Sequence, residues 1–242
     1  MKPIEKDLMT GMISILNQAI ESKQNGTPIM EDKYIDIRLA DLKEFEAETD
    51  VMFINSPNCK IDLESIVNIK GISKDSLKEC RDVSEIIECS NQIGMIVYPD
   101  IVGTDIIATY IDGYLISVQS NYGNSKKIVQ HINLPYKIKK DGIYTVKGRI
   151  AHINKPIFYV NDILEGGSGN LKDDLNEAEN LNFDVTPFWF ANNLNPKKLK
   201  DTIDYAINYV SDDGFECDGI IFKFSEKKFN NVLNFVGYYY KY

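Results

Sequence analysis

Apolar residues in the first fifty positions recur with the period of an amphipathic α-helix. Residues 5–22 place apolar side chains three or four positions apart, at Leu8, Met12, Leu16, Ala19 and Ile20. Residues 31–48 repeat this spacing with Ile35, Leu39, Leu42 and Phe45. The sequence Asn-Gly-Thr-Pro at 25–28 separates the two runs and is typical of a helix break. The pattern predicts two helices joined by a short turn.

From about residue 94 the apolar residues alternate or form short β-branched runs, which is typical of strands. Such runs occupy 94–98, 105–110 and 114–119. The dipeptide Asp112-Gly113 lies between the last two runs and is typical of a tight hairpin turn. The central part of the chain therefore predicts antiparallel strands.

Other elements are expected on either side of these strands. Ser73 has a side chain suited to capping a helix, whose inner face would consist of Leu77, Cys80, Val83 and Ile87. Asn195-Pro196 is typical of a helix start. Strand-like runs return at 217–224 and 235–242. The whole order predicts an α+β fold with antiparallel sheets, divided into a helical piece at 1–62 and a body at 63–242.

Length and charge limit the class of protein. The chain has 242 residues and a formal net charge of −9, with 27 basic and 36 acidic side chains. An acidic chain is a poor candidate for coating nucleic acid, although a local basic groove stays possible. No apolar run reaches the length of a membrane span, and the first residues lack the apolar core of a signal peptide. We therefore expect a cytoplasmic protein without membrane contact. Its four cysteines have no metal-binding spacing, so no metal site is expected.

Several short motifs follow one another in an order that resembles the NAD-dependent DNA ligases. They are IMEDKYIDIRLADLKEFEAE (29–48), NSPNCKI (55–61), TYIDGYLISVQSNYG (109–123), YTVKGRI (144–150), FYVNDILEGGSGNLKDDL (158–175), CDGIIFKF (217–224) and GYYYKY (237–242). The third is similar to the Lys-x-Asp-Gly strand pair that ends in Asn-Gly, and the fourth to Val-Arg-Gly-Glu. The resemblance implies a nucleotidyltransferase fold preceded by a small helical domain.

The resemblance also implies which residues would hold a nucleotide. Asp112, Gly113 and Asp218 match positions of the family's pocket. Lys223 and Lys241 match the lysines that contact the AMP phosphate in that family. If the pocket still functions, its ligand would be NAD or AMP; otherwise no cofactor is expected.

The chain departs from the family at the positions that perform the chemistry. With the Asp-Gly pair at 112–113, the nucleophilic lysine becomes Tyr110 and the glutamate two residues before it becomes Ala108. The third-motif glutamate becomes Arg149, and the Thr-Arg-Gly-Asp-Gly segment expected after Gly123 is missing. The tyrosines and histidine that grip nicotinamide are also absent from the first helix, and only Tyr34 remains in the second.

Because a tyrosine cannot form the lysyl–AMP phosphoramidate, the sequence predicts a pseudo-ligase with no catalytic residue. Such a protein would be kept as a binding or structural subunit, in a homo-oligomer or a complex with another protein, with DNA contact weak or indirect. The expected surfaces are the helices at 5–48 and the aromatic end at 235–242. Lysine- and asparagine-rich composition points to an AT-rich, phage-like source.

Two alternatives stay open. One is an active, divergent DNA ligase component in which Lys126, Lys127 or Lys147 replaces the nucleophile. The other is a non-catalytic AMP or NAD binder. The later domains of a ligase are not expected after Tyr242.

Overall fold

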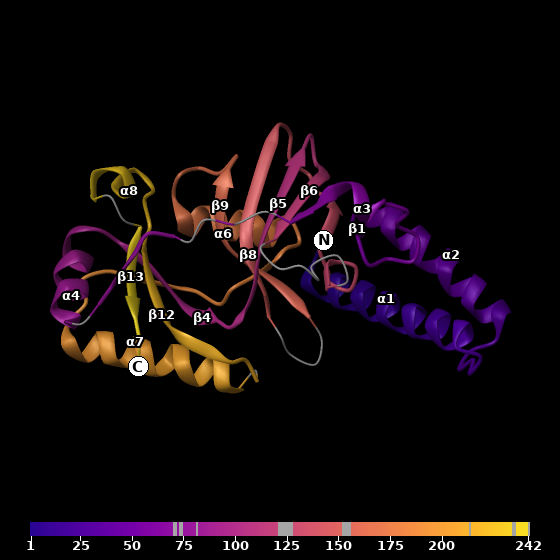
Figure 1. Ribbon diagram of the computed structural model, residues 1–242, viewed down its shortest axis with the longest axis horizontal. Coiled ribbons are helices and arrows are strands. Elements are labelled where there is room, and N and C mark those ends of the chain that lie inside the picture. Colours follow the sequence, from indigo (N-terminus) through magenta and orange to yellow (C-terminus); the bar gives the residue numbers. More distant parts are fainter. Residues whose placement is uncertain are drawn as a thin grey trace.

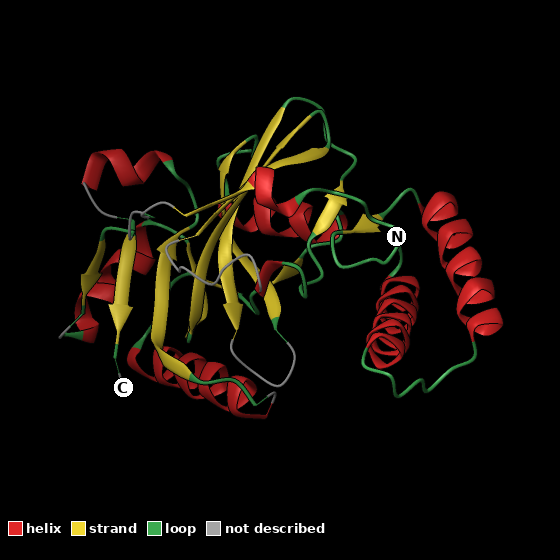
Figure 2. Ribbon diagram, turned by 45° about the vertical axis from the view of Figure 1, so that its right-hand side comes forward, coloured by secondary structure: helices red, strands yellow, loops and turns green. Residues whose placement is uncertain are grey.

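A computed structural model describes residues 1–69, 72, 75–80, 82–120, 128–151, 156–212, 214–233 and 236–241. Its first two elements are the helices α1 (Pro3–Gln24) and α2 (Asp32–Thr49), which confirm the predicted helical hairpin. The hairpin projects from the body of the molecule (Figures 1 and 2). It has a hydrophobic core of its own, made of Met9, Ile13, Leu16, Ala19, Ile35, Leu42, Val51 and Phe53.

The described part of the chain forms two sheets. The larger has eight strands in the order β1-β7-β6-β5-β8-β9-β10, with β2 paired to β6. Its strands are β1 (Met52–Phe53), β2 (Val67–Ile69), β5 (Gly103–Ile111), β6 (Tyr114–Ser120), β7 (Pro135–Lys137), β8 (Ile143–Ala151), β9 (Ile157–Glu165) and β10 (Asp184–Val185). The short helix α3 (Leu63–Ile66) precedes β2, and α6 (Leu171–Asn180) contributes Leu171, Leu175 and Ala178 to the core of this sheet.

The smaller sheet has five strands in the order β11-β4-β12-β13-β3. They are β3 (Leu77–Glu79), β4 (Met95–Ile101), β11 (Trp189–Ala191), β12 (Cys217–Phe224) and β13 (Gly237–Tyr240). The helices α4 (Val83–Gln92) and α7 (Pro196–Asp212) cover its outer face, and α8 (Lys228–Leu233) links β12 to β13 (Figure 1). Most strand pairs in the two sheets are antiparallel, so the α+β fold class is confirmed.

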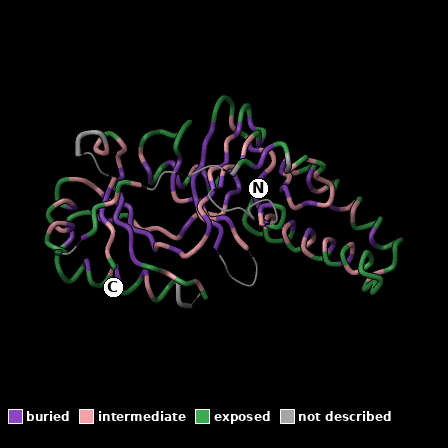
Figure 3. Tube along the Cα trace, viewed as in Figure 1, coloured by how far each residue is buried: buried purple, intermediate pink, exposed green. Residues whose placement is uncertain are grey.

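Alternation along β4 and β12 divides their side chains between two cores. Met95, Val97 and Phe222 point toward α4 and α7 on the outer face. Tyr98 and Ile221 instead join the core of the larger sheet. Buried positions are concentrated in the strands of both sheets (Figure 3). The inner faces of the two sheets therefore contact each other, and polar side chains on these faces lie between them.

Two expectations about local structure need correction. The helix expected to run from Ser73 through Leu77 begins only at Val83, capped by the Asp82 side chain, which accepts a hydrogen bond from the Ser84 amide at 2.9 Å. Leu77 lies in β3 because it pairs with Gly237 in β13; Ser73 is outside the described residues. The aromatic end is not free either: β13 lies between β12 and β3 in the sheet, and Tyr238 is buried. No helix among the described residues is long and apolar enough to cross a membrane.

Candidate functional site

A pocket of about 540 Å³ opens between the inner faces of the two sheets. Its lining is unusually rich in charge and consists of Asp75, Leu77, Glu79, Tyr98, Asp100, Asp105, Lys147, Arg149, Asn161, Asp218, Ile221, Tyr239 and Lys241. These residues come from β3, β4, β12 and β13 of the small sheet and from β5, β8 and β9 of the large one, apart from Asp75 and Lys241, which flank strands.

Strand pairing explains which side chains reach the pocket. In β5 and β8, Asp105 is paired with Arg149, and Lys147 lies two residues before Arg149, so the three side chains share one face. Ile106 and Val146 alternate to the opposite face and enter the hydrophobic core. Across the pocket, β12 carries Lys223 two residues after Ile221, on the face directed at the large sheet. The two sheets thus bring positive side chains toward one another.

Lys223 is the most buried of these cations, with only 3% of its side chain exposed. Its Nζ lies 2.7 Å from an Asp162 carboxylate oxygen and 2.9 Å from an Asp75 oxygen. Burial by itself would lower the pKa of Lys223, but Asp162, Tyr98 and Asp75 raise it above its usual value. Lys223 is therefore a fixed positive charge that joins β12 to β9.

Asp75 connects two of the lysines. One of its carboxylate oxygens accepts a hydrogen bond from Lys147 at 2.6 Å, and the other accepts one from Lys223 at 2.9 Å. Burial opposes ionisation of this carboxyl, but Lys223 and Lys147 outweigh it and lower its pKa to about 2. A carboxylate between two lysines occupies the kind of position in which a phosphate group would bind.

Arg149 makes a second ion-paired cluster in the same pocket. Its Nη1 lies 2.6 Å from Asp100 and its Nε 2.9 Å from Asp105, and Nη1 also donates to the Ile101 carbonyl at 2.9 Å. Burial would lower the pKa of Arg149, but the two aspartates raise it. The guanidinium thus holds the end of β4 against β5 and β8.

The pocket contains some of the residues expected from the sequence and not others. Asp218 and Lys241 line it, both exposed, and Lys223 lies beneath it. Arg149, which the resemblance aligns with a glutamate of the family, also lines the pocket. Lys147, one of the possible replacement nucleophiles, is part of the lining, whereas Lys126 and Lys127 lie outside the described residues.

Tyr110 is not brought to the pocket. It lies an odd number of residues from Asp105 on β5 and points to the opposite face, where it is fully buried. Its hydroxyl donates a hydrogen bond to the Pro135 carbonyl at 2.7 Å, and its ring meets Phe183 edge to face. Burial, and then Tyr144, raises the pKa of Tyr110 well above its usual value. Tyr110 is a core residue in this fold.

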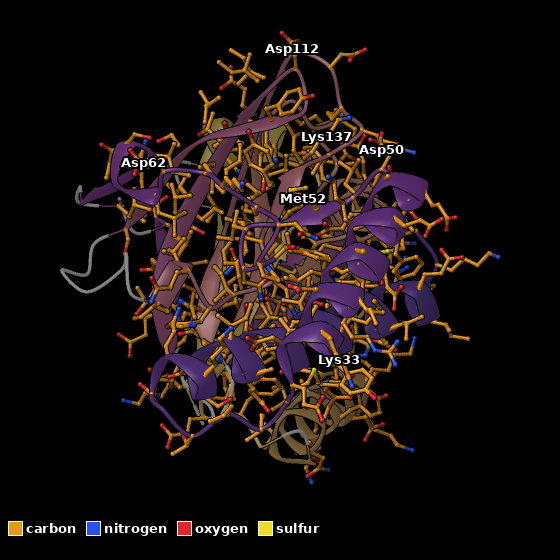
Figure 4. All side chains as sticks on the ribbon, turned by 90° about the vertical axis from the view of Figure 1, so that its right-hand side faces the viewer. Lys33, Asp50, Met52, Asp62, Asp112 and Lys137 are labelled. Atoms are coloured by element: carbon orange, nitrogen blue, oxygen red, sulfur yellow. The ribbon has the colours of Figure 1, made fainter. Side chains whose placement is uncertain are left out.

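Asp112 and Gly113 lie outside the pocket as well. They form the turn between β5 and β6 with φ angles of 48° and 82°, in the left-handed region that a two-residue hairpin requires. The Asp112 carboxylate accepts a hydrogen bond from the Gly142 amide at 3.0 Å. Asp112 is at the tip of the hairpin (Figure 4). The Asp-Gly pair thus has a structural explanation that needs no nucleotide.

A segment that begins ten residues before Tyr110 does lead to the pocket. Asp100-Ile101-Val102-Gly103 lies where β4 ends and β5 begins. At Gly103 a Cβ atom would lie 2.2 Å from the Ile150 carbonyl oxygen, so only glycine fits there. By contrast, Asp75 and Asp162 were missed because they lie in no recognisable motif. Asp162 meets Lys223 only through the packing of the two sheets, and Asp75 meets it only because β3 joins the same sheet as β12.

The charges of the lining disfavour a polyphosphate ligand. Five carboxylates face three cations, and Lys147 and Arg149 among these cations are already ion-paired within the chain. Within the described part of the chain no cluster of histidine, cysteine and acidic residues is suited to hold a metal ion. A nucleotide phosphate would have to displace carboxylates of the protein itself to reach Lys147 or Lys223.

Comparison with known proteins gives a limited relationship to ligases. No family profile matches the chain. Over 153 residues it is 29% identical to a DNA ligase of Ruminiclostridium cellulolyticum, a match that covers 58% of this chain and 23% of that ligase. Among solved structures, a mutant of the Naegleria gruberi RNA ligase with ATP and Mn has a TM-score of 0.44 and 12% identity, covering 70% of this chain and 56% of the other. The same RNA ligase with PPi has a TM-score of 0.40, 13% identity and coverages of 68% and 58%.

The chain is thus weakly similar in sequence to part of a DNA ligase. It spans about a quarter of the length of the curated ligase that it matches. At these levels of similarity, the chemistry of the pocket itself has to carry the functional assignment.

Proposed function

We propose that this protein is a pseudo-ligase: a scaffold of the ligase nucleotidyltransferase type that does not transfer a nucleotidyl group and serves as a binding subunit. The observation that carries the proposal is the ion pair between Arg149 and Asp100, at 2.6 Å in the pocket. If the Lys-x-Asp-Gly pattern is placed on Asp100-Ile101-Val102-Gly103, the following Asp112-Gly113 takes the place of the Asn-Gly hairpin turn.

With this placement the charges at two catalytic positions are reversed. Asp100 stands where the family has its nucleophilic lysine, and Arg149 stands where it has the third-motif glutamate. Tyr98 takes the place of the glutamate two residues before the lysine. An aspartate ion-paired to an arginine provides no amine for attack on an α-phosphate. This supports loss of catalysis more directly than the tyrosine at position 110 does.

We expect no covalent adenylate on the intact protein after incubation with NAD or with ATP, in the presence of Mg²⁺ or Mn²⁺. The reason is that neither Asp100 nor Tyr110 can form a stable phosphoramidate. Intact mass spectrometry measures the result directly, with an authentic DNA ligase as the positive control. A stoichiometric gain of one AMP would contradict the proposal.

One observation favours a second candidate, an active and divergent adenylyltransferase. Lys147 reaches the pocket, and its Nζ lies 2.6 Å from Asp75 and close to Lys223 on the same carboxylate. If an adenylate does form, the variant Lys147→Ala distinguishes the cases. Loss of the adenylate in this variant would make Lys147 the nucleophile, whereas its persistence would place the nucleophile elsewhere. Testing NAD and ATP separately identifies the nucleotide donor.

Replacing Asp75 by asparagine is expected to increase the affinity of the pocket for inorganic pyrophosphate and for AMP at least tenfold. Asp75 neutralises Lys147 and Lys223, so its loss leaves both lysines able to bind an anion, and each charge-assisted contact is worth about 1.5–3 kcal/mol. Isothermal titration calorimetry of the parent protein and the variant measures the change.

Glu79→Gln is the matched control for this experiment. Glu79 lines the same pocket and its replacement removes the same charge, but no ion pair joins it to either lysine. An equal gain in affinity in both variants would mean that net charge alone governs binding. No gain in Asp75→Asn would show that the two lysines do not form an anion site, and would argue against a nucleotide-binding role.

A further inference from the structure

A second, mainly aromatic groove lies on the outer side of the small sheet, away from the charged pocket. It has a volume of about 440 Å³ and is formed by the edge strand β11 and one face of α7. From β11 and the residues after it come Trp189, Phe190, Ala191, Asn192 and Leu194; from α7 come Lys198, Asp201, Thr202 and Tyr205. Neither the proposed pseudo-ligase function nor the ligase resemblance gives this groove a role.

The aromatic rings hold one another in place. Trp189 meets Tyr205 edge to face with ring centres 5.3 Å apart, and it meets Tyr209 in the same way at 5.9 Å. Tyr205 and Tyr209 nevertheless remain 55% and 40% exposed. Large rings that are fixed by packing and yet open to solvent present ready-made surfaces for stacking, because little side-chain entropy is lost when a planar group binds.

Positive charge is available beside these rings. Lys198 lines the groove from the first turns of α7, is exposed, and makes no ion pair with any described residue. Lys172 lies 5.3 Å from the ring centre of Phe190, which is exposed at the rim of the groove. In the charged pocket, by contrast, Lys147, Arg149 and Lys223 are all ion-paired within the chain.

The length of the surface sets the size of its ligand. Lys198, Tyr205 and Tyr209 follow one face of α7 at helical spacing, and the eleven residue steps from Lys198 to Tyr209 span about 16 Å. That length accommodates roughly three to five stacked nucleotides, since successive nucleotides along one strand are about 3.4 Å apart. Aromatic rings combined with unpaired lysines are the features that bind single-stranded nucleic acid with little sequence preference.

We propose that the groove between β11 and α7 binds single-stranded nucleic acid, with bases stacked on Tyr205, Tyr209 and Phe190 and phosphates held by Lys198 and Lys172. Asp201, which also lines the groove, limits the affinity. The net charge of −9 makes the chain as a whole a poor binder of duplex DNA. It does not oppose this local contact strongly, because charges farther away than a Debye length of about 8 Å are largely screened at physiological salt.

Trp189 is the only tryptophan of the chain and lies in the middle of this surface, so its fluorescence reports binding without a label. The probe is an oligothymidylate of about ten nucleotides, within the range of single-stranded binding sites. We expect saturable quenching that weakens with salt. Tyr205→Ala should weaken binding at least about tenfold. Changing Lys172 and Lys198 to glutamine should lower the slope of log affinity against log salt concentration by about 0.7 for each lost phosphate contact. Asp201→Asn should strengthen binding.

Tyr34→Ala is the matched control, because Tyr34 is also an exposed tyrosine beside a lysine, with Lys33 4.8 Å from its ring centre, but it lies on α2. It should leave affinity unchanged. Equal loss in Tyr34→Ala and Tyr205→Ala, equal binding of a duplex of the same length, or no quenching at low salt would overturn the proposal. So would light scattering that shows a dimer dissociated by Tyr205→Ala without oligonucleotide binding, since the groove would then be a protein interface. None of these outcomes depends on whether the charged pocket transfers a nucleotide.

Discussion

Replacing Lys223 by methionine is expected to lower the free energy of unfolding by about 3 kcal/mol, near the lower end of the cost of breaking a buried ion pair. Methionine has a similar length, so the main loss is the positive charge between Asp75 and Asp162. Each aspartate keeps one other cation, Lys147 for Asp75 and Lys227 for Asp162, which keeps the cost at the lower end. Urea denaturation measures the change.

Lys241→Met is the control, because Lys241 lines the same pocket but is exposed. Its replacement should change stability by no more than about 0.5 kcal/mol, as is usual for surface substitutions. If the two variants are equally stable, Lys223 is not the structural centre of the site. The family resemblance treats both lysines as phosphate ligands, whereas the structure gives Lys223 a role in joining the sheets even without a ligand.

Tyr110→Lys is expected to destabilise the protein by at least about 3 kcal/mol and to create no ligase activity. The new amine would lie in the hydrophobic core beside Phe183, where an uncompensated charge is costly. Burial would lower the pKa of this lysine in the folded state, while its unfolded value stays near 10.4. Because the unfolded state then binds more protons, the loss of stability should grow as the pH falls from about 10 toward 7.

Thermal unfolding at several pH values measures this effect, and Tyr110→Phe is the matched control. It removes only the hydroxyl and its hydrogen bond to Pro135, so it should cost about 1 kcal/mol with no comparable pH dependence. A stable Tyr110→Lys protein that forms an adenylate would show that position 110 does lie at the nucleophile's site, against the geometry described above.

An aspartate-glycine pair can mark either a nucleotide motif or a hairpin, and the printed residues alone do not decide between them. At 112–113 the pair closes the turn between β5 and β6. The alternative segment at 100–103 lacks the lysine and the aspartate of the motif. The sequence alone therefore does not identify it, and only its position in the pocket does. In the proposed placement, the position of the family's nucleophile is the pocket residue Asp100 instead of the core residue Tyr110.

Sequence patterns that span only a few residues were sufficient to predict most of the helices and strands. The helical spacing in 5–22 and 31–48, the alternation in β6 and the Asn195-Pro196 start of α7 each depend on neighbours a few residues away, and each corresponds to an observed element. The stretch before α4 was misjudged because Leu77 owes its strand conformation to a pairing with Gly237, which is 160 residues away. The division at residue 62 and the existence of a protein partner remain predictions.

The sequence by itself determined the α+β class and the helical hairpin, because local periodicity encodes these features. The family resemblance implied that Asp218, Lys223 and Lys241 lie in one region. Only the tertiary structure decided what the site contains. Asp75, Asp100 and Asp162 come from separate parts of the chain, and their carboxylates neutralise Lys223, Lys147 and Arg149 only where the two sheets meet. The physical reason is that ion pairing depends on distances of a few ångströms between residues far apart in sequence, and no local pattern specifies such distances.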